Sequence, residues 1–236
     1  MNNQQTYFPN DSAHDLNFLY SRGVTDFVHF TDFRNLPGIL DAGLLPRATL
    51  DQMGAKYLGT DNLRLDDKNA VNLSITNPNI KMFYGKWIEL QKRANTHYFV
   101  MLTLDPALLS DAKGFYEFRR GNAASWDSQP SSVEDLFAGN RPAYFEPSWT
   151  TDNQAEIRIW GRIDPRRIKT IQFPANYYKI SEQPWPDFLA GRAKELDLPL
   201  EVVLCDRLFH YYKSPIGQEY EQKRLFKCRV IHPQKK

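Results

Sequence analysis

The chain of 236 residues lacks the features that mark several common classes of protein. Its two cysteines, Cys205 and Cys228, have neither CxxC nor Cys/His spacing, so we predict reduced thiols, no metal site and a cytoplasmic location. No apolar run is long enough to span a membrane, and residues 1–10 are too polar for a secretion signal, so we expect no membrane partner. Glycine-rich phosphate loops and the HExxH, GxSxG and kinase motifs are also absent, which argues against the enzyme classes that depend on them.

Net charge and composition add few constraints on function. Lys and Arg total 30 against 28 Asp and Glu, and the net charge of +2 is too small to diagnose nucleic-acid binding. Basic clusters at 119–120 and 166–169 could guide a phosphate backbone, although most such clusters are solvated surface. Aromatic residues make up 14% of the chain, and many fall in loop-like stretches where they could stack on a ligand or a base. We expect one domain over residues 1–236, with a loose tail over residues 1–12.

Short strands dominate the pattern of apolar residues, and a few helices interrupt them without regular alternation. We therefore predict an α+β fold. Strands are expected at 27–31, 70–75, 97–104, 115–118, 154–160, 168–173 and 198–204, and helices at 16–20, 35–42 and 185–196. A further helix is expected from residue 81, whereas residues 219–229 fit a strand or a helix.

Two long stretches have little regular periodicity. Residues 48–68 are polar and mixed, with helical spacing only near residues 50–53, and they predict a mobile flap. Residues 127–151 show helical spacing only at 133–138, and a long irregular stretch inside a domain usually has a functional role.

Residues 28–47 predict a strand, a turn and a short helix that together form a corner suited to a ligand. The strand delivers His29 and Thr31. Asp32 is placed to cap the helix that follows, Pro37 suits its first turn, and Gly43 suits a left-handed position at its end. By itself, this corner does not identify a ligand.

One carboxylate stands out in the strand predicted at 154–160. Alternation puts Ala155, Ile157 and Ile159 on one face, and Glu156 on the other face with Arg158. Glu156 follows the long irregular stretch, where it could act as a base or stabilise a developing positive charge. The alternative is a solvent-facing glutamate that pairs with Arg158.

Four blocks of the sequence, in order and spacing, resemble the DarT family of ADP-ribosyltransferase toxins, which use NAD to modify nucleobases. The blocks are HFTDFRNLPGILDAGLL at 29–45, NLSITNPNIKMFY at 72–84, NAAS at 122–125 and QAEI at 154–157. The resemblance covers roughly residues 25–210. It implies an ADP-ribosyltransferase fold, a split β-sandwich of two small sheets of short strands with flanking helices around a cleft for NAD.

The resemblance also implies roles for particular residues. Glu156 becomes the catalytic glutamate, while His29, Thr31 and Asn35 fall in the NAD-binding corner. Arg64 is the candidate for a catalytic or pyrophosphate-contacting arginine, and Arg47 competes with it. The alternatives are structural, because His29 could be a satisfied histidine at a strand end and Asn35 could cap a turn.

A further set of residues suggests which nucleobase accepts the ADP-ribose. Lys81 and Tyr84 match the guanine-modifying branch of the family better than the thymine-modifying one, and Tyr84 could instead stack on nicotinamide or belong to the core. Asn122 belongs to the third block of the resemblance and is a candidate for substrate contact. Tyr144, Phe145 and Trp149 could stack a splayed base, which suits a single strand better than a duplex, or they could anchor their loop to the core.

From these features we expect an NAD-dependent ADP-ribosyltransferase that modifies single-stranded DNA as a toxin or antiphage effector. The same chemistry on RNA bases is the nearest alternative. A protein that holds NAD or nucleic acid without turnover is an alternative of a different class. A cognate antitoxin is expected as a partner, and a macrodomain ADP-ribosyl hydrolase is one candidate for it.

Overall fold

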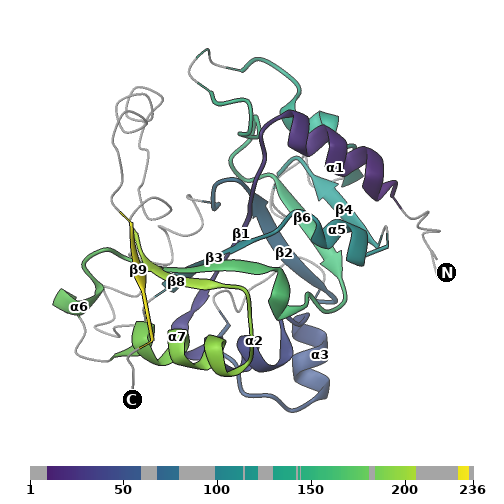
Figure 1. Ribbon diagram of the computed structural model, residues 1–236. Helices are drawn as coiled ribbons and strands as arrows, with labels where there is room; N and C mark the ends of the chain where they lie inside the picture. Colours follow the sequence, from purple (N-terminus) through teal and green to yellow (C-terminus); the bar gives the residue numbers. More distant parts are fainter. Residues whose placement is uncertain are drawn as a thin grey trace.

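The computed structural model describes residues 10–59, 68–79, 99–113, 115–121, 130–141, 143, 145–180, 184–205 and 228–233, and the description below is limited to these residues. Its strands and helices form an α+β fold, as predicted (Figure 1). The helix expected from residue 81 lies outside the described residues, as does the 219–229 segment apart from residues 228–229.

Nine strands form one mixed sheet in the order β5-β4-β6-β2-β1-β3-β7-β8-β9. All neighbouring strands are antiparallel except β7 and β8, which are parallel. The strands are β1 (Phe27–Asp32), β2 (Ala70–Ile75), β3 (Phe99–Leu104), β4 (Tyr116–Arg119), β5 (Pro130–Ser131), β6 (Glu156–Trp160), β7 (Ile168–Phe173), β8 (Glu201–Leu204) and β9 (Arg229–Ile231). The seven strands predicted from the sequence are therefore present, within three residues at each end that the structure describes.

The sheet has a narrow seam between β1 and β2. These strands share only two register pairs, Phe27 with Ile75 and Val28 with Ser74, whereas β1 and β3 pair over six. The resemblance implies two separate small sheets. In the described part of the chain, the β1–β2 seam instead joins the strands β5-β4-β6-β2 and the strands β1-β3-β7-β8-β9 into one sheet. The sequence therefore predicts the strands correctly but not their union in one sheet.

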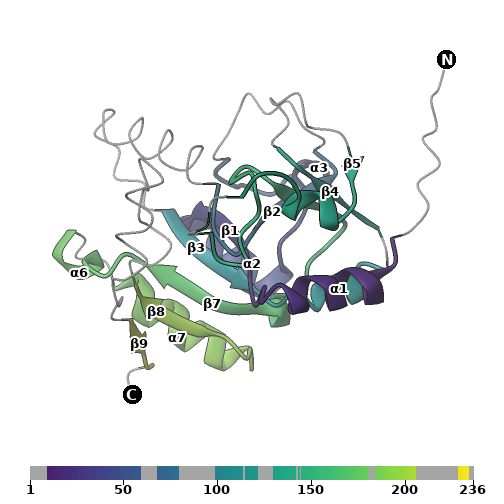
Figure 2. The same cartoon turned by 90° about the horizontal axis from the view of Figure 1, so that it is seen from above.

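The helices are α1 (Ser12–Ser21), α2 (Leu36–Ala42), α3 (Arg47–Gln52), α5 (Leu108–Asp111), α6 (Tyr177–Ile180) and α7 (Trp185–Glu195). A hydrogen bond from Tyr116 to Asp15 joins β4 to α1, and α1 also contacts α5. At the other end of the sheet, α7 packs against β8 and α2 (Figure 2). The carboxylate of Asp11 caps α1 by accepting hydrogen bonds from the backbone N–H groups of Ala13 and His14. Because Ser12 already belongs to α1, the predicted tail of residues 1–12 is too long.

The corner predicted at residues 28–47 is confirmed in its local structure. Pro37 lies in the first turn of α2, as predicted. Asp32 is expected from the sequence to cap this helix but instead caps the preceding 3-10 turn η1 (Phe33–Asn35), by accepting the N–H of Arg34. Gly43 ends α2 with φ +84°. A Cβ at this position would lie 2.2 Å from the carbonyl oxygen of Ile163, so both the turn and the close approach of the chain require glycine.

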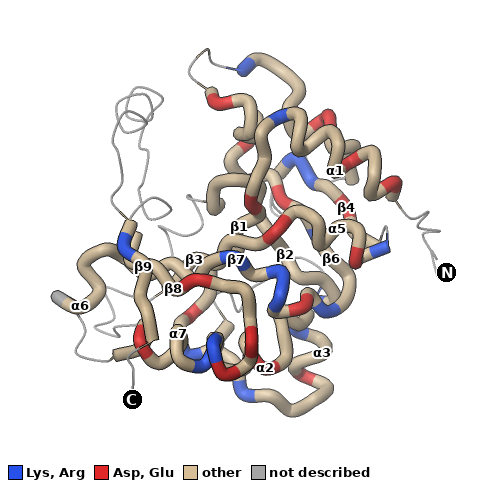
Figure 3. The backbone as a smooth tube through the Cα atoms, in the orientation of Figure 1, with Lys and Arg blue, Asp and Glu red and all other residues tan. Residues whose placement is uncertain are grey.

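One cluster of buried apolar side chains extends from Leu16 in α1 to Ile231 in β9. That a single domain covers the whole chain stays a prediction. Acidic and basic residues are interspersed along the described backbone (Figure 3). Within the described ranges, no helix is long and apolar enough to cross a membrane.

The prediction of reduced cysteines is wrong for this structure, in which Cys205 and Cys228 form a disulfide. Cys205 directly follows β8, and Cys228 directly precedes β9. Because β8 and β9 are antiparallel with Leu204 opposite Arg229, the two cysteines are brought together at the same end of the strands. Sequence spacing alone did not reveal this pairing, and the cytoplasmic location inferred from reduced thiols stays a prediction.

Candidate active site

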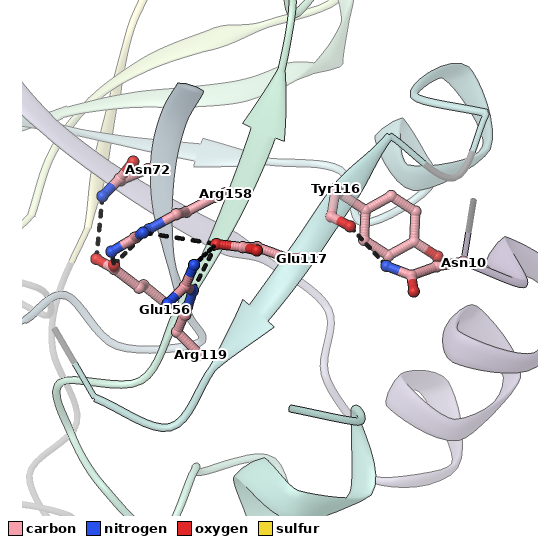
Figure 4. A network of polar contacts seen from close by, with 7 residues as sticks. All are labelled: Asn10, Asn72, Tyr116, Glu117, Arg119, Glu156 and Arg158. Atoms are coloured by element: carbon pink, nitrogen blue, oxygen red, sulfur yellow. Dashed lines mark hydrogen bonds and ion pairs between the residues drawn. The ribbon is translucent and has the colours of Figure 1, made fainter. Parts of the chain in front are cut away.

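A row of polar side chains crosses three neighbouring strands of the sheet (Figure 4). In the β2–β6–β4 register, Arg158 lies between Asn72 and Glu117, and Glu156 is opposite Arg119 on β4. Directly opposite residues of paired strands point to the same face, so these five side chains share one face of the sheet. The alternate residues of the same strands are apolar and belong to the buried core: Val71, Leu73, Tyr116, Phe118, Ile157 and Ile159.

Glu156 is held at both of its carboxylate oxygens. Arg158 donates to Oε1 from Nε at 2.9 Å and from Nη2 at 2.7 Å, and Asn72 donates from Nδ2 to Oε2 at 3.1 Å. The side chain of Glu156 is only 12% exposed. The alternative prediction, a glutamate paired with Arg158, is therefore correct about the partner and wrong about exposure to solvent.

Arg158 is itself buried, with a side chain 6% exposed. Its Nη1 lies 3.5 Å from Oε1 of Glu117, whose side chain is 5% exposed and which also pairs with Arg119. Two carboxylates and two guanidinium groups thus balance one another. Buried charges require such pairing because their removal from water is costly.

His29 connects the predicted corner to this row. Its Nδ1 lies 3.0 Å from the carbonyl oxygen of Asn72, and since a carbonyl only accepts, Nδ1 carries the hydrogen. The side chain of Asn72 meets Glu156 while its backbone meets His29. One residue of β2 therefore joins the two side chains that the sequence analysis selected independently, at the strand next to the seam.

Thr31 and Asn35 lie in the corner and contact protein groups. Thr31 is 5% exposed, and its hydroxyl accepts from Nδ2 of Asn35 at 3.0 Å. The Asn35 amide also donates to the carbonyl of Leu58 at 3.0 Å and accepts its N–H at 2.9 Å. Asn35 therefore holds the segment that follows α3 in place. This structural role is separate from its predicted contact with NAD.

Arg47 begins α3 and lies beside the ring of Tyr57. The guanidinium carbon is 5.8 Å from the ring centroid, and Nε is 3.5 Å from the hydroxyl, which donates to Asp51 at 2.8 Å. These contacts hold Arg47 against Tyr57, in the part of the predicted flap that precedes residue 60. Its competitor Arg64 lies outside the described residues, as do Lys81, Tyr84, Asn122 and Tyr144.

Trp149 belongs to an anchored part of the long loop. Its ring meets that of Phe145 edge to face, with centroids 5.7 Å apart, and its carbonyl oxygen accepts from Nη2 of Arg141 at 2.7 Å. Thr76, directly after β2, donates to the carbonyl of Ser148 at 2.9 Å. Phe145 and Trp149 are both half-buried residues, so the anchoring of the loop does not bury them completely.

The opposite face of β4 carries a different polar pair. The hydroxyl of Tyr116 donates to Oδ2 of Asp15 at 2.6 Å, which joins β4 to α1. Burial raises the pKa of the Asp15 carboxyl above its ordinary value, and the hydrogen bond from Tyr116 opposes that rise. Burial and the neighbouring Asp15 likewise raise the pKa of Tyr116.

The sequence analysis assigned no role in the site to Asn72 or Glu117, and it named Arg119 only as part of a basic cluster. Asn72 begins the second block of the resemblance, and Glu117 alternates with aromatic residues in the strand predicted at 115–118. That signal becomes useful only when the register places β4 opposite β6.

Comparison with solved structures shows which known fold the chain has. It shares its fold with a protein that was solved with NAD+ and with an analogue of NAD+. The structures are Thermus sp. 2.9 DarT with carba-NAD+ (TM-score 0.51, 17% identity) and the same protein with NAD+ (TM-score 0.51, 16% identity), and each match covers 80% of this chain and 98% of the other. The protein therefore has the fold of Thermus DarT.

A third matched structure is of a protein whose chain is longer than this one. Thermosipho africanus DarTG in complex with ADP-ribose has a TM-score of 0.49 and 16% identity, and the match covers 75% of this chain. The aligned part spans 49% of the Thermosipho chain, about half its length. No protein-family model matches the sequence, and no curated protein matches it.

Proposed function

We propose that this protein is an NAD-dependent ADP-ribosyltransferase that transfers ADP-ribose to a nucleobase in single-stranded DNA, with Glu156 as the catalytic glutamate. The observation that carries the proposal is the position of Glu156. Its carboxylate is oriented by Arg158 and Asn72 and joined through Asn72 to His29. The fold that positions these residues is shared with Thermus DarT, which was solved with NAD+.

The chemistry of NAD explains why a held carboxylate is useful. When the bond between nicotinamide and ribose breaks, the ribose develops oxocarbenium-like charge, which a nearby carboxylate stabilises. The base nitrogen then forms the new bond to the ribose carbon, and its proton passes to Glu156 as the general base. Nicotinamide leaves, and the ADP-ribosyl group stays on the base.

The NAD site that we propose lies between the two halves of the sheet, at the β1–β2 seam. His29, Thr31 and Asn35 would line it from the β1 side, and Tyr84 would stack on nicotinamide. An arginine would hold the pyrophosphate, and Arg64 and Arg47 both remain candidates. Arg47 is supported by its place at the start of α3 beside the residues that Asn35 fastens.

The acceptor that we propose is guanine rather than thymine, on the strength of the block that contains Lys81 and Tyr84. Asn122, Tyr144 and Trp149 are proposed to contact the substrate strand. The partly exposed rings of Phe145 and Trp149 support stacking on an unpaired base. The proposed role is that of a cytoplasmic toxin or antiphage effector, with a cognate antitoxin that could be a macrodomain ADP-ribosyl hydrolase.

The proposal is tested by incubating the protein with NAD and oligonucleotides of single-stranded DNA or RNA that differ by one base. Nucleosides from the digested products are analysed by mass spectrometry. The expected result is ADP-ribosylated deoxyguanosine from single-stranded DNA and none from duplex DNA. Modification of RNA alone would transfer the proposal to the RNA alternative, whereas NAD binding without any product would favour the binding-module alternative. Modification of a protein but of neither polymer would show that the nucleobase proposal is wrong.

A further inference from the structure

We propose that Arg158 is a positioning residue for this reaction, which holds Glu156 by one oxygen while Glu117 anchors Arg158 from the other side. The inference rests on the proposed function, because it assigns a role to residues around its catalytic glutamate. Neither Arg158 nor Glu117 carried a catalytic assignment in the sequence analysis.

The first step is the geometry of the held oxygen. Both Nε and Nη2 of Arg158 converge on Oε1 of Glu156, at 2.9 and 2.7 Å. An oxygen with two lone pairs is thereby saturated by charged donors, which are the stronger kind of hydrogen bond. The carboxylate cannot rotate without breaking both contacts, so Arg158 fixes its orientation.

The second step is the anchoring of Arg158. Arginine is long and loses much rotamer freedom when it is held in one place. Here Glu117 lies directly opposite Arg158 on β4, with Nη1 of the arginine 3.5 Å from Oε1 of the glutamate. Arg119 shares that same oxygen of Glu117. The row therefore transmits the rigidity of β4 to the catalytic side chain on β6.

The third step is the cost of the arrangement. The side chains of Glu117 and Arg158 are 5% and 6% exposed, and buried ion pairs often stabilise a protein no more than apolar residues of similar volume would. The buried pair is better explained by the precise placement that it gives to the carboxylate of Glu156. Displacement of a reacting group by about 1 Å can cost about a hundredfold in rate.

The experiment compares Arg158→Met, Arg158→Lys and a matched control, Arg192→Met. Nε and Nη2 of Arg192 also converge on one carboxylate oxygen, Oδ1 of Asp41, at 3.3 and 2.7 Å, but Arg192 lies on α7, outside the polar row. For each purified and folded variant, kcat for transfer to single-stranded DNA, KM for NAD and the pH profile of kcat are measured. Circular dichroism establishes folding before the assays.

Arg158→Met is expected to lower kcat about a hundredfold and leave KM for NAD within about threefold. The acid limb of its pH profile is expected to move to higher pH, because the positive charge that favours ionised Glu156 is gone. Arg158→Lys keeps the charge and should recover part of kcat with the acid limb in its original place. Arg192→Met should match the parent in all three measurements. A purely structural role would reduce the folded fraction without moving the acid limb.

Glu117→Gln provides a second route to the same test if Arg158→Met does not fold. It keeps an acceptor opposite Arg158 and is expected to lower kcat about tenfold with KM for NAD unchanged. Parent-like kcat and an unmoved acid limb in folded Arg158→Met, or parent-like kcat in both Arg158→Lys and Glu117→Gln, would overturn the inference. If the parent protein itself transfers no ADP-ribose, the proposed function fails and the inference falls with it, and the parent arm distinguishes this result.

Discussion

Arg158 and Arg167 each grip carboxylates with several N–H groups, yet they do so in opposite surroundings. The Arg158 side chain is 6% exposed between Glu156 and Glu117, which are 12% and 5% exposed. Arg167 is 31% exposed, and its partner Asp111 is 50% exposed. Water screens the second arrangement, so it contributes little to stability. In the first arrangement the ion pairs offset only part of the cost of burial, because Oε2 of Glu117 is buried with no hydrogen-bond partner among the described residues. The difference indicates that the main role of the buried row is to position the Glu156 carboxylate and not to add stability.

The largest effect on the rate of transfer is expected when the charge of Glu156, in the buried polar row, is removed. Glu156→Gln keeps the size of the side chain and an acceptor for Arg158, but it loses the charge and the base. We expect the rate of transfer to fall about a thousandfold, within the usual range for loss of a general base, while NAD still binds. Asp111→Asn makes the same change at the exposed cluster and should leave the rate unaltered. Transfer kinetics and calorimetric NAD binding check both variants.

Stability should separate the two arginines next. Arg158→Met leaves two buried carboxylates without their shared partner, which should lower the free energy of unfolding by about 3–5 kcal/mol. Arg167→Met removes a partly exposed pair and should cost about 0–1 kcal/mol. Urea unfolding followed by circular dichroism measures both values. Equal losses would show that burial does not distinguish the two clusters.

Asn72 tests the link between the row and the corner. Asn72→Ala removes the hydrogen bond to Oε2 of Glu156 but keeps the backbone carbonyl that His29 contacts. We expect about a tenfold loss of transfer rate, which corresponds to one hydrogen bond of about 1.4 kcal/mol. Asn72→Asp should be worse than Asn72→Ala, because two carboxylates in contact cannot both stay ionised. The contrary ranking, measured by transfer rate at fixed pH, would mean that Asn72 does not act on Glu156.

The smallest effect on activity is expected on the opposite face of β4. Tyr116→Phe removes the hydrogen bond to Asp15 and should lower stability by about 1–3 kcal/mol at neutral pH without changing the transfer rate. Because burial raises the folded pKa of Asp15 above the unfolded value of 3.8, the protonated carboxyl favours folding, and this contribution is lost as pH rises through the folded pKa. The hydroxyl opposes that loss by stabilising the carboxylate. The difference between parent and variant in urea unfolding should therefore shrink at acid pH; a difference that does not depend on pH would contradict this account.

The sequence was most informative where structure is local. Alternation of apolar residues predicts the strand of Glu156, and helix signals predict Pro37 and Gly43 in their observed roles, whereas Asp32 caps the 3-10 turn before α2 and not α2 itself. Candidates from such patterns, His29 and Glu156, lie in one connected network. These successes share a cause, since each depends on neighbours within a few residues.

The rest depended on contacts between distant segments. Asn72 and Glu117 became visible only when β2 and β4 were seen on either side of β6, and no local pattern fixes that register. The disulfide between Cys205 and Cys228 likewise follows from the pairing of β8 with β9. The union of all nine strands in one sheet depends on only two register pairs between β1 and β2, which no periodicity reveals.

The central claim is that Glu156 catalyses transfer of ADP-ribose to a base of single-stranded DNA. Its most direct test is mass spectrometry of nucleosides from one guanine-containing oligonucleotide treated with NAD and either the parent protein or Glu156→Gln. The account predicts a deoxyguanosine heavier by one ADP-ribosyl group with the parent, and about a thousandfold less of it with the folded, NAD-binding variant. Equal amounts from both proteins, or unmodified nucleosides from the parent, would contradict it.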